Sequence, residues 1–367
     1  MYSLPIAIVF IFCSVLGNTD QVPSATDSSL VDLDVEIPAG KTVEQYVQEV
    51  TDFWTDERLN QAIPQPLLNG DLLPTNENSS NTTTTNPDEH EKSLFVQQTL
   101  PTSSSTTSKR AGYPNTVGKV FYVSNGNSYS CSASVVTANN RDMIFTAGHC
   151  VYSITANAFV TNFIFIPQYD NNTRPYGTWV ARALRAFSSW ASYGDLNADV
   201  AVVLLYTLNG QHIQDVVGGQ AVGFNYGHSA IVHSFGYPSN YLNGQMMTFC
   251  TGTKYFPNYS TYTGDAVPCG MNQGCSGGPW LQSFSFFNLS GIQTSVNSFT
   301  RNATPNVMYG PYFGSSVLSM YNELKDNTGT TGTPSIPRSE ANCCLASTTL
   351  LLLLRALHQY FHNSFLP

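Results

Sequence analysis

The chain is poor in charged residues. They make up 11% of its 367 residues, against about 25% in an average soluble domain. With only 15 lysines and arginines, the chain lacks the basic surface on which nucleic-acid binding depends, so we expect no nucleic-acid partner. The net charge of −9 is also unevenly spread, because residues 1–110 hold 15 acids and 5 bases, whereas residues 111–367 hold 9 acids and 10 bases. The acidity therefore belongs to the first third of the chain.

The N-terminal apolar run is too short to cross a membrane. Tyr2–Leu16 would span less than the roughly 30 Å of hydrocarbon in a bilayer, and it ends in small or compact residues. We interpret residues 1–17 as a cleaved secretory signal peptide rather than a membrane anchor. Export to an oxidising, extracellular location would permit disulfides and N-glycosylation. Six Asn-Xaa-Ser/Thr sites are present, at Asn78, Asn81, Asn171, Asn258, Asn288 and Asn302.

Residues 18–110 have the composition of a pro-region. They are acidic, with a helical pattern at Thr42–Gln61, and then become rich in Ser, Thr and Asn, as in Asn76–Asn86. Such polar tracts bury too little apolar area to offset the entropy lost on ordering. The segment ends at the dibasic pair Lys109–Arg110, which we predict to be cut by a subtilisin-like processing protease.

The sequence beyond residue 111 is typical of an all-β protein, with short β-rich runs between turn signals. A closing amphipathic helix is predicted at Ser315–Lys325. Residues 327–367 form a linker and an apolar tail, whose run at Leu345–Leu357 is short and is followed by a polar end. We favour a trimmed extension over membrane attachment by this tail. The predicted strands are Val117–Ser124, Ser128–Val136, Met143–Thr146, Phe159–Ile166, Thr178–Phe187, Val200–Tyr206, Ala230–Phe235, Gly244–Thr251, Trp280–Phe286 and Gly291–Ser298.

The run Gly274–Trp280 carries the strongest candidate for a nucleophile. Ser276 stands in Gly-Cys-Ser-Gly-Gly, where the glycines allow a tight turn that presents the hydroxyl. The main-chain N–H groups of Gly274 and Ser276 would then point at one spot in front of it and form an oxyanion hole. A glycine-rich hairpin without activity is the alternative for this run taken alone, so the partners of the serine decide between the two.

Two earlier motifs supply candidate partners for this serine. His149 follows a predicted strand, and a disulfide between Cys131 and Cys150 would hold its loop against the preceding hairpin. Asp199 opens an apolar strand, where a carboxylate is costly to bury unless a donor such as a histidine N–H pairs with it. Asp195 is the competing acid, and we expect it to be solvated because it lies outside that strand.

Histidine, aspartate and serine in this chain order match a known arrangement. From about residue 112 to residue 325 the chain resembles the trypsin/chymotrypsin superfamily of serine endopeptidases, and most closely its V8-like, glutamyl-endopeptidase-like branch. The resemblance implies two six-stranded antiparallel β-barrels with the active site between them. It makes Ser276 the nucleophile, His149 the general base and acid, Asp199 its orienting partner, and the N–H groups of Gly274 and Ser276 the oxyanion hole. The matching motifs are Val117–Val120, Cys131–Ser134, Thr146–Cys150, Asp199–Ala201, Phe235–Pro238 and Gly274–Trp280.

One departure from the family pattern concerns activation. Trypsin and chymotrypsin carry an aspartate before the nucleophile, which receives the new N-terminus on activation, whereas this chain has Cys275. Cleavage after Arg110 would therefore act through a different structural link, or the pro-region would serve as an inhibitor or folding aid.

A second departure concerns the substrate pocket. A basic-specific pocket of this superfamily has an aspartate six residues before the serine, where this chain has Gly270, followed by Met271. The wall strand contains Val296, Asn297 and Ser298 and lacks the histidine of glutamyl endopeptidases. We therefore expect the pocket to accept an uncharged or small side chain.

The remaining cysteines predict a second disulfide, between Cys250 and Cys269, which closes the loop leading into the catalytic turn. We interpret Cys275 as a small buried residue rather than a redox or metal ligand. Cys343 and Cys344 lie in the tail, so one thiol stays unpaired unless the molecule dimerises or the tail is lost. No metal-ligand spacing is present, and no cofactor is expected.

Together these features predict a secreted serine endopeptidase, made as a zymogen, with its protease domain at residues 111–326. Its expected partners are protein or peptide substrates and a protease that processes the pro-region. A catalytically silent homologue that binds a partner through the same fold is the alternative, and the intact triad argues against it. A lipase or esterase is disfavoured because Ser276 comes last in the chain and lies in no strand-to-helix elbow.

Overall fold

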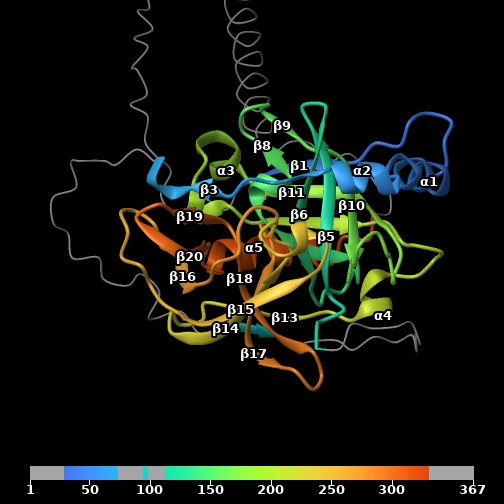
Figure 1. Cartoon of the computed structure of the whole chain (residues 1–367). Helices are drawn as coiled ribbons and strands as arrows, with labels where there is room; N and C mark the ends of the chain where they lie inside the picture. The colour runs from blue at the N-terminus through green and yellow to red at the C-terminus, as the bar shows by residue number, and fades with distance from the viewer. Residues whose placement is uncertain (1–28, 73–93, 98–111, 330–367) are drawn as a thin grey trace, which may run out of the picture. The chain divides into compact units, whose positions relative to one another are not determined.

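The computed structural model describes residues 29–72, 94–97 and 112–329 (Figure 1). One compact unit extends to Asn327, and a second begins at Thr328, of which the structure describes two residues. The expected signal peptide, the pair Lys109–Arg110, the apolar run at 345–357 and the two tail cysteines lie outside the described residues. No helix in the described part of the chain is long and apolar enough to cross a bilayer.

A closed barrel of six antiparallel strands forms the first half of the protease region. The strands follow each other around it in the order β10-β5-β6-β7-β12-β11, and β11 pairs back with β10. The β5–β6 hairpin turns at Asn125 and Gly126, whose positive φ angles of 49° and 75° suit a tight hairpin connection. The strands are β5 (Val117–Ser124), β6 (Asn127–Val135), β7 (Met143–Thr146), β10 (Thr161–Pro167), β11 (Trp179–Phe187) and β12 (Ala201–Leu205).

The second half of the protease region forms two sheets, to which the chain before residue 111 adds the end strands β4 (Leu94–Val96) and β3 (Leu68–Asn69). Their strand orders are β15-β14-β17-β18-β13-β4 and β16-β20-β19-β3, and an isolated bridge between Tyr255 and Ala266 joins them. Together with the first barrel they confirm the all-β, two-barrel architecture. The strands are β13 (Ala221–Phe224), β14 (Ala230–Gly236), β15 (Thr248–Lys254), β16 (Asp265–Pro268), β17 (Pro279–Ser285), β18 (Ser290–Val296), β19 (Phe299–Arg301) and β20 (Thr304–Gly310).

The predicted C-terminal helix is confirmed as α5 (Ser315–Leu324), which buries Val317, Met320, Tyr321 and Leu324. The Asn140 amide donates to the Leu324 carbonyl at 2.8 Å, which ties the helix end to the first barrel. The connections between strands carry short elements. They are β8 (Tyr152–Ser153), β9 (Ala158–Phe159), α3 (Ser188–Tyr193), α4 (Ile213–Val217), η2 (Gly148–Cys150), η3 (Leu196–Ala198) and η4 (Leu242–Gly244).

The N-terminal segment at residues 29–72, which the sequence places in the pro-region, packs onto both halves of the protease region (Figure 1). Strand β1 pairs with β11 over five residues, and the indole N–H of Trp54 donates to the Asn162 carbonyl at 2.7 Å. Trp54 is 1% exposed, so the contact adds real apolar burial. The elements are β1 (Leu30–Asp34), α1 (Val43–Phe53), α2 (Asp56–Gln61), β2 (Ile63–Pro64), β3 (Leu68–Asn69), η1 (Gly70–Leu72) and, further on, β4 (Leu94–Val96).

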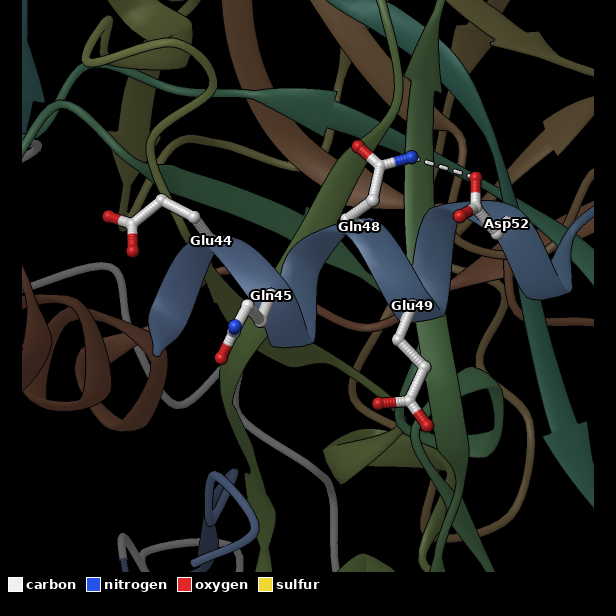
Figure 2. A pocket seen from close by; sticks show the side chains of 5 residues that line it. All are labelled: Glu44, Gln45, Gln48, Glu49 and Asp52. Carbon is white, nitrogen blue, oxygen red and sulfur yellow. Dashed lines mark hydrogen bonds between the residues drawn. The ribbon is translucent and has the colours of Figure 1, made fainter. Parts of the chain in front are cut away.

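Helix α1 confirms the helical pattern expected between residues 42 and 61. It begins with a capping box, in which the Thr42 hydroxyl accepts from the Gln45 N–H and the Gln45 side chain accepts from the Thr42 N–H. Its polar side chains line a shallow surface hollow, where Gln48 donates to Asp52 at 2.7 Å (Figure 2). All five lining residues come from this one helix, so the hollow does not bring together functional groups from distant parts of the chain.

Most strands of the protease region match the sequence prediction closely. The bounds of β5 and β7 are as expected, and β6, β10, β11, β12, β14, β17 and β18 differ by a few residues at their ends. Strand β15 starts later than expected, at Thr248, because a short 3-10 turn takes up the preceding residues. Sequence periodicity does not predict four of the strands, namely β13, β16, β19 and β20. All of them but β20 have four residues or fewer, which leaves little room for a periodic pattern.

Lys119 is a buried cation that makes the stability of this fold depend on pH. Its ammonium donates to the Gly244 carbonyl at 2.8 Å and lies 5.0 Å from the centroid of the Phe121 ring. Although both contacts favour the charged form, burial lowers the pKa of Lys119 from 10.5 to about 7. The unfolded chain therefore binds more protons than the folded chain between about pH 7 and pH 10, and stability should rise with pH in that window.

We predict that Lys119→Met flattens this pH dependence. Each unit of pKa depression corresponds to about 1.4 kcal/mol, so the wild-type free energy of unfolding should gain a few kcal/mol between pH 7 and pH 10 while the variant gains much less. Urea denaturation at several pH values measures both slopes. Lys41→Met, which changes a half-exposed lysine beside α1, is the control and should keep the wild-type slope. Equal slopes for wild type and Lys119→Met would contradict the prediction.

Candidate active site

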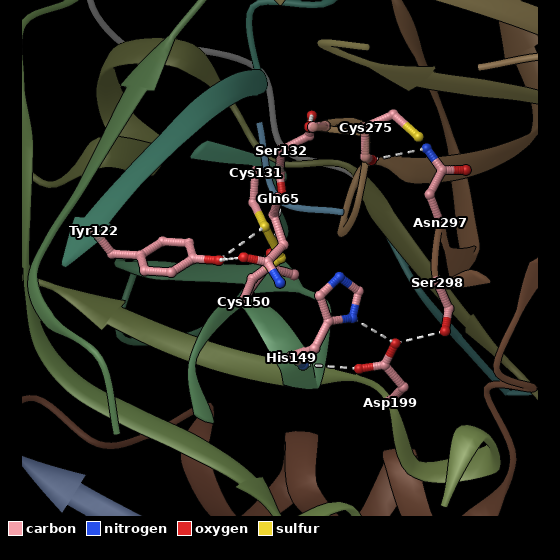
Figure 3. Close-up of a disulfide and its surroundings, with 12 residues drawn as sticks. Gln65, Tyr122, Cys131, Ser132, His149, Cys150, Asp199, Cys275, Asn297 and Ser298 are labelled. Carbon is pink, nitrogen blue, oxygen red and sulfur yellow. Dashed lines mark hydrogen bonds and ion pairs between the residues drawn. A yellow bond between two sulfur atoms is a disulfide. The ribbon is translucent and has the colours of Figure 1, made fainter. Parts of the chain in front are cut away.

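His149 and Asp199 form a buried hydrogen-bonded pair (Figure 3). The Nδ1 atom of His149 lies 2.8 Å from Oδ2 of Asp199, and the His149 main-chain N–H donates to Oδ1 at 2.8 Å. The histidine side chain is 4% exposed and the aspartate side chain is fully buried. Because the acid binds both the ring and the main chain of the same residue, the orientation of the imidazole is fixed.

A third hydrogen bond to this carboxylate comes from the second half of the protease region. The Ser298 hydroxyl donates to Oδ2 of Asp199 at 2.5 Å (Figure 3). Three donors therefore satisfy a fully buried acid, which lies between η3 and β12 as the sequence predicted. The competing acid, Asp195, is half-buried and accepts the Asn197 N–H at 3.0 Å. Asp195 is therefore less solvated than expected, and this burial raises the pKa of its carboxyl.

Ser276 lies against the segment that carries His149. The Ser276 carbonyl accepts from the Ser132 N–H at 2.7 Å. A Cβ atom on Gly277 would come within 2.1 Å of Thr146 Oγ1 and 2.7 Å of the Ala147 nitrogen, so this turn touches the chain just before His149 and tolerates only glycine. Among the described residues, the Ser276 hydroxyl and the Nε2 atom of His149 are both buried without a hydrogen-bond partner. The Ser276 hydroxyl can therefore act as a donor and the His149 Nε2 atom as an acceptor without breaking an existing hydrogen bond.

Asn297 holds the turn that carries Ser276. Its amide nitrogen donates to the carbonyls of Cys275 and Phe235, each at 3.1 Å. Its Oδ1 atom accepts from the Ser234 hydroxyl at 2.6 Å and from the Trp280 indole at 2.7 Å. The Asn297 side chain is fully buried and makes all four of its hydrogen bonds with the protein.

Both predicted disulfides are confirmed, Cys131–Cys150 and Cys250–Cys269. The first joins β6 to η2 and so restrains the turn that bears His149 (Figure 3). Cys275 is a free, fully buried cysteine whose thiol pKa is raised by burial, as suits a small core residue with little reactivity.

The residues predicted to form the substrate pocket lie in several different environments. Gly270 is exposed, and its carbonyl accepts from the Asn240 side chain at 2.8 Å. Met271 is buried in a small apolar cluster around Trp280, and Val296 belongs to the main core. Asn297 and Ser298 are engaged as described above, and the role of these five residues in substrate selection stays a prediction.

Gly274 has an unexpected partner. Its N–H group, which the sequence assigns to the oxyanion hole, donates to the carbonyl of Gln65 at 3.0 Å. Gln65 belongs to the N-terminal segment, and its side chain accepts from the Tyr122 hydroxyl at 2.8 Å (Figure 3). Nothing in the sequence around Gln65 signals this contact, because it is made by a main-chain carbonyl.

Comparison with solved structures identifies the family. The chain is similar to the protease Anisep from Arthrobacter nicotinovorans, with 38% identity, a TM-score of 0.54, and coverage of 63% of this chain and all of that one. It is similarly related to the thermostable serine protease AL20 from an extremophilic microorganism, with 36% identity, a TM-score of 0.53, and coverage of 58% of this chain and 98% of that one. The chain belongs to the trypsin/chymotrypsin superfamily of serine proteases. No family model matches it.

The chain also matches one protein that is named as a metalloprotease rather than a serine protease. The chain is 27% identical over 188 residues to a protein named extracellular metalloprotease from Bacillus subtilis (strain 168). The match covers 48% of this chain and 54% of that protein, so the chain spans about half the length of this relative. Among the described residues, the set of potential metal ligands that lies close together is Cys131, His149 and Cys150. The disulfide occupies both sulfur atoms, which does not fit a metal site.

We predict that Asn297→Ala destabilises this protease by about 3 to 5 kcal/mol, because four buried groups lose their partner at once. Chemical denaturation followed by tryptophan fluorescence measures the change. Asn127→Ala is the matched control, since Asn127 is exposed and makes one side-chain hydrogen bond, of 3.3 Å, to Asn125. The control should change stability by less than about 0.5 kcal/mol. A similar small loss for Asn297→Ala would show that the turn does not depend on it.

Proposed function

We propose that the protein is a secreted serine endopeptidase that is made as a zymogen and hydrolyses peptide bonds through an acyl-enzyme on Ser276. The observation that carries this proposal is the His149–Asp199 pair, whose free Nε2 atom and the free Ser276 hydroxyl are buried in the same region of a serine protease fold. A histidine oriented by a carboxylate, with its other nitrogen unoccupied, is the arrangement that activates a serine hydroxyl.

The proposed reaction uses the residues in the following way. His149 Nε2 takes the proton from the Ser276 hydroxyl as the oxygen attacks the substrate carbonyl carbon. The N–H groups of Gly274 and Ser276 stabilise the charge that develops on the carbonyl oxygen. His149 then gives its proton to the leaving amine nitrogen, which breaks the C–N bond and leaves the acyl group on Ser276. A water molecule, deprotonated by His149 in turn, hydrolyses that ester.

The proposed maturation starts from residues 1–17 as signal peptide and 18–110 as pro-region, followed by the protease domain at 111–326 and the tail at 327–367. Export is supported by the two disulfides, which persist in oxidising compartments. It is also supported by the exposure of Asn171, Asn258, Asn288 and Asn302, the glycosylation sites within the described residues. Cleavage after Arg110 would break the covalent link between the pro-region and the protease domain.

We predict that Asp199→Asn lowers kcat about 10⁴-fold, because an amide holds the wrong tautomer of His149. Asp195→Asn is a matched control, since asparagine can still accept the N–H group that Asp195 accepts, and it should change kcat less than about tenfold. Both variants are assayed with a peptide substrate after the pro-region has been removed. Equal losses in the two variants would contradict the assignment of Asp199.

A serine-directed fluorophosphonate probe tests the nucleophile itself. We expect wild-type protein freed of its pro-region to be labelled on Ser276, and Ser276→Ala to remain unlabelled, with trypsin as a positive control. Peptide mapping locates the label. No labelling of the wild-type protein while trypsin is labelled would refute the enzyme and favour a silent homologue.

We expect a peptide library to show preference for uncharged or small side chains at the position before the cut, because Gly270 replaces the acid that a basic-specific pocket would have. Mass spectrometry of the products measures the preference. Dominant cleavage after Arg, Lys or Glu would contradict it.

A further inference from the structure

The part of the N-terminal segment at residues 63–71, which we call the crossing strand, joins the two halves of the protease region at the candidate active site. Its first residues form β2, which pairs in parallel with β6 at Tyr129 and Ser130. Its later residues form β3, which pairs in parallel with β19 at Phe299 and Thr300. Strand β6 continues into Cys131, and β19 directly follows Ser298, the donor to Asp199. The crossing strand thus runs from one side of the triad to the other.

Gln65 is the third residue of the crossing strand, and three of its groups are bound. Its N–H donates to the Ser130 carbonyl at 2.9 Å, and its Oε1 atom accepts from the Tyr122 hydroxyl at 2.8 Å (Figure 3). Its carbonyl accepts the Gly274 N–H at 3.0 Å. This donor is one of the two that the proposed reaction needs at the substrate carbonyl, so a substrate cannot use it while Gln65 is in place.

The neighbours of Gln65 favour an inhibitor over a substrate. Pro64 lies against Gly274, where an added Cβ would come within 3.2 Å of the proline Cβ. The bond after the Gln65 carbonyl leads to Pro66, so the leaving group of an attack here would be a ring nitrogen with no hydrogen and a fixed φ. The ring restricts the rotation by which that nitrogen would turn its lone pair toward His149. The carbonyl can therefore occupy the site without being cleaved quickly.

Contacts outside the site hold the crossing strand in position. Asp71 accepts from Arg301 Nε at 2.9 Å and from the Asn302 N–H at 2.7 Å. The Tyr259 hydroxyl donates to the Gly70 carbonyl at 2.7 Å. At the other end, Trp54 and the pairing of β1 with β11 fasten the segment to the first barrel. None of these contacts involves the covalent link at residues 109–110.

We propose that the crossing strand is an inhibitor that stays bound to the active site after cleavage at Lys109–Arg110, so that activation requires a second event that removes residues 29–72. This inference rests on the proposed endopeptidase function. The dibasic cut alone leaves every contact described above intact. The first barrel closes through β10, β11 and β12 without any strand from residues 29–72, so the protease region keeps that barrel when the segment leaves.

The test compares three forms of the full chain after cleavage behind Arg110 by a dibasic-specific protease: wild type, Asp71→Ala and the control Asp52→Ala. Asp52 is exposed on α1, and its side chain accepts from Gln48 of the same helix. The readout is the rate of fluorophosphonate labelling. Asp71→Ala should be labelled at least tenfold faster than the other two, because its crossing strand has lost the Arg301 and Asn302 contacts.

A further arm separates failure of this inference from failure of the proposed function. Cleaved wild-type protein is digested until mass spectrometry detects no part of residues 29–72, and is then labelled. Fast labelling here, with slow labelling after the single cut, supports the inhibitor. Equally fast labelling after the single cut overturns the inhibitor alone. No labelling in any arm, with trypsin labelled, overturns the endopeptidase and the inhibitor with it.

A synthetic peptide of residues 61–72 provides a readout that does not depend on the folding of a variant. Added to the digested protein, it should slow labelling in a dose-dependent way, and the same peptide with Asp71→Ala should need at least a tenfold higher concentration. Equal potency of the two peptides, or no protection by either, would overturn the proposed binding mode.

Discussion

The carboxylate of Asp199 is fully buried, and the hydrogen bonds that satisfy it organise the whole site. An uncompensated charge in such a position would cost several kcal/mol, so the fold must bring donors to it. Two come from His149, 50 positions earlier in the chain, and one comes from Ser298, 99 positions later. The same contacts that satisfy the acid therefore join the two halves of the protease region and fix the imidazole.

The second constraint is the glycine-rich turn that presents Ser276. Gly277 must lack a side chain because the chain before His149 passes directly beside it, and Asn297 holds the turn from within. Within the described part of the chain, the Ser276 hydroxyl and the Nε2 atom of His149 are both buried and have no hydrogen-bond partner. What covers this chemistry is the N-terminal segment, whose Gln65 carbonyl binds the Gly274 N–H. In the proposed function this arrangement serves acyl transfer, and in the proposed inhibition the Gln65 carbonyl closes it to substrate.

Much of this architecture could be predicted from the sequence, because its signals are local. The β-rich run of β5, the disulfide spacing around His149 and the isolated acid before an apolar strand each show in a few residues. The role of the crossing strand could not be predicted, since a pair such as Ile63–Pro64 has no periodicity and takes its strand geometry from the edge of β6. Gln65 acts through its carbonyl, a group that every residue has. The four hydrogen bonds of the Asn297 side chain could not be predicted, because sequence gives position along the chain but not which neighbours enclose a side chain.

A crystal structure of the full chain after cleavage behind Arg110 tests the central claim most directly, namely that the site is complete but closed. The account predicts that His149 Nδ1 remains about 3 Å from Oδ2 of Asp199 and that the imidazole faces the turn that carries Ser276. It also predicts that residues 63–71 remain across the site, with the Gln65 carbonyl about 3 Å from the Gly274 nitrogen. Electron density that shows Ser276 turned away from His149, or an open Gly274 N–H with the crossing strand gone, would contradict it.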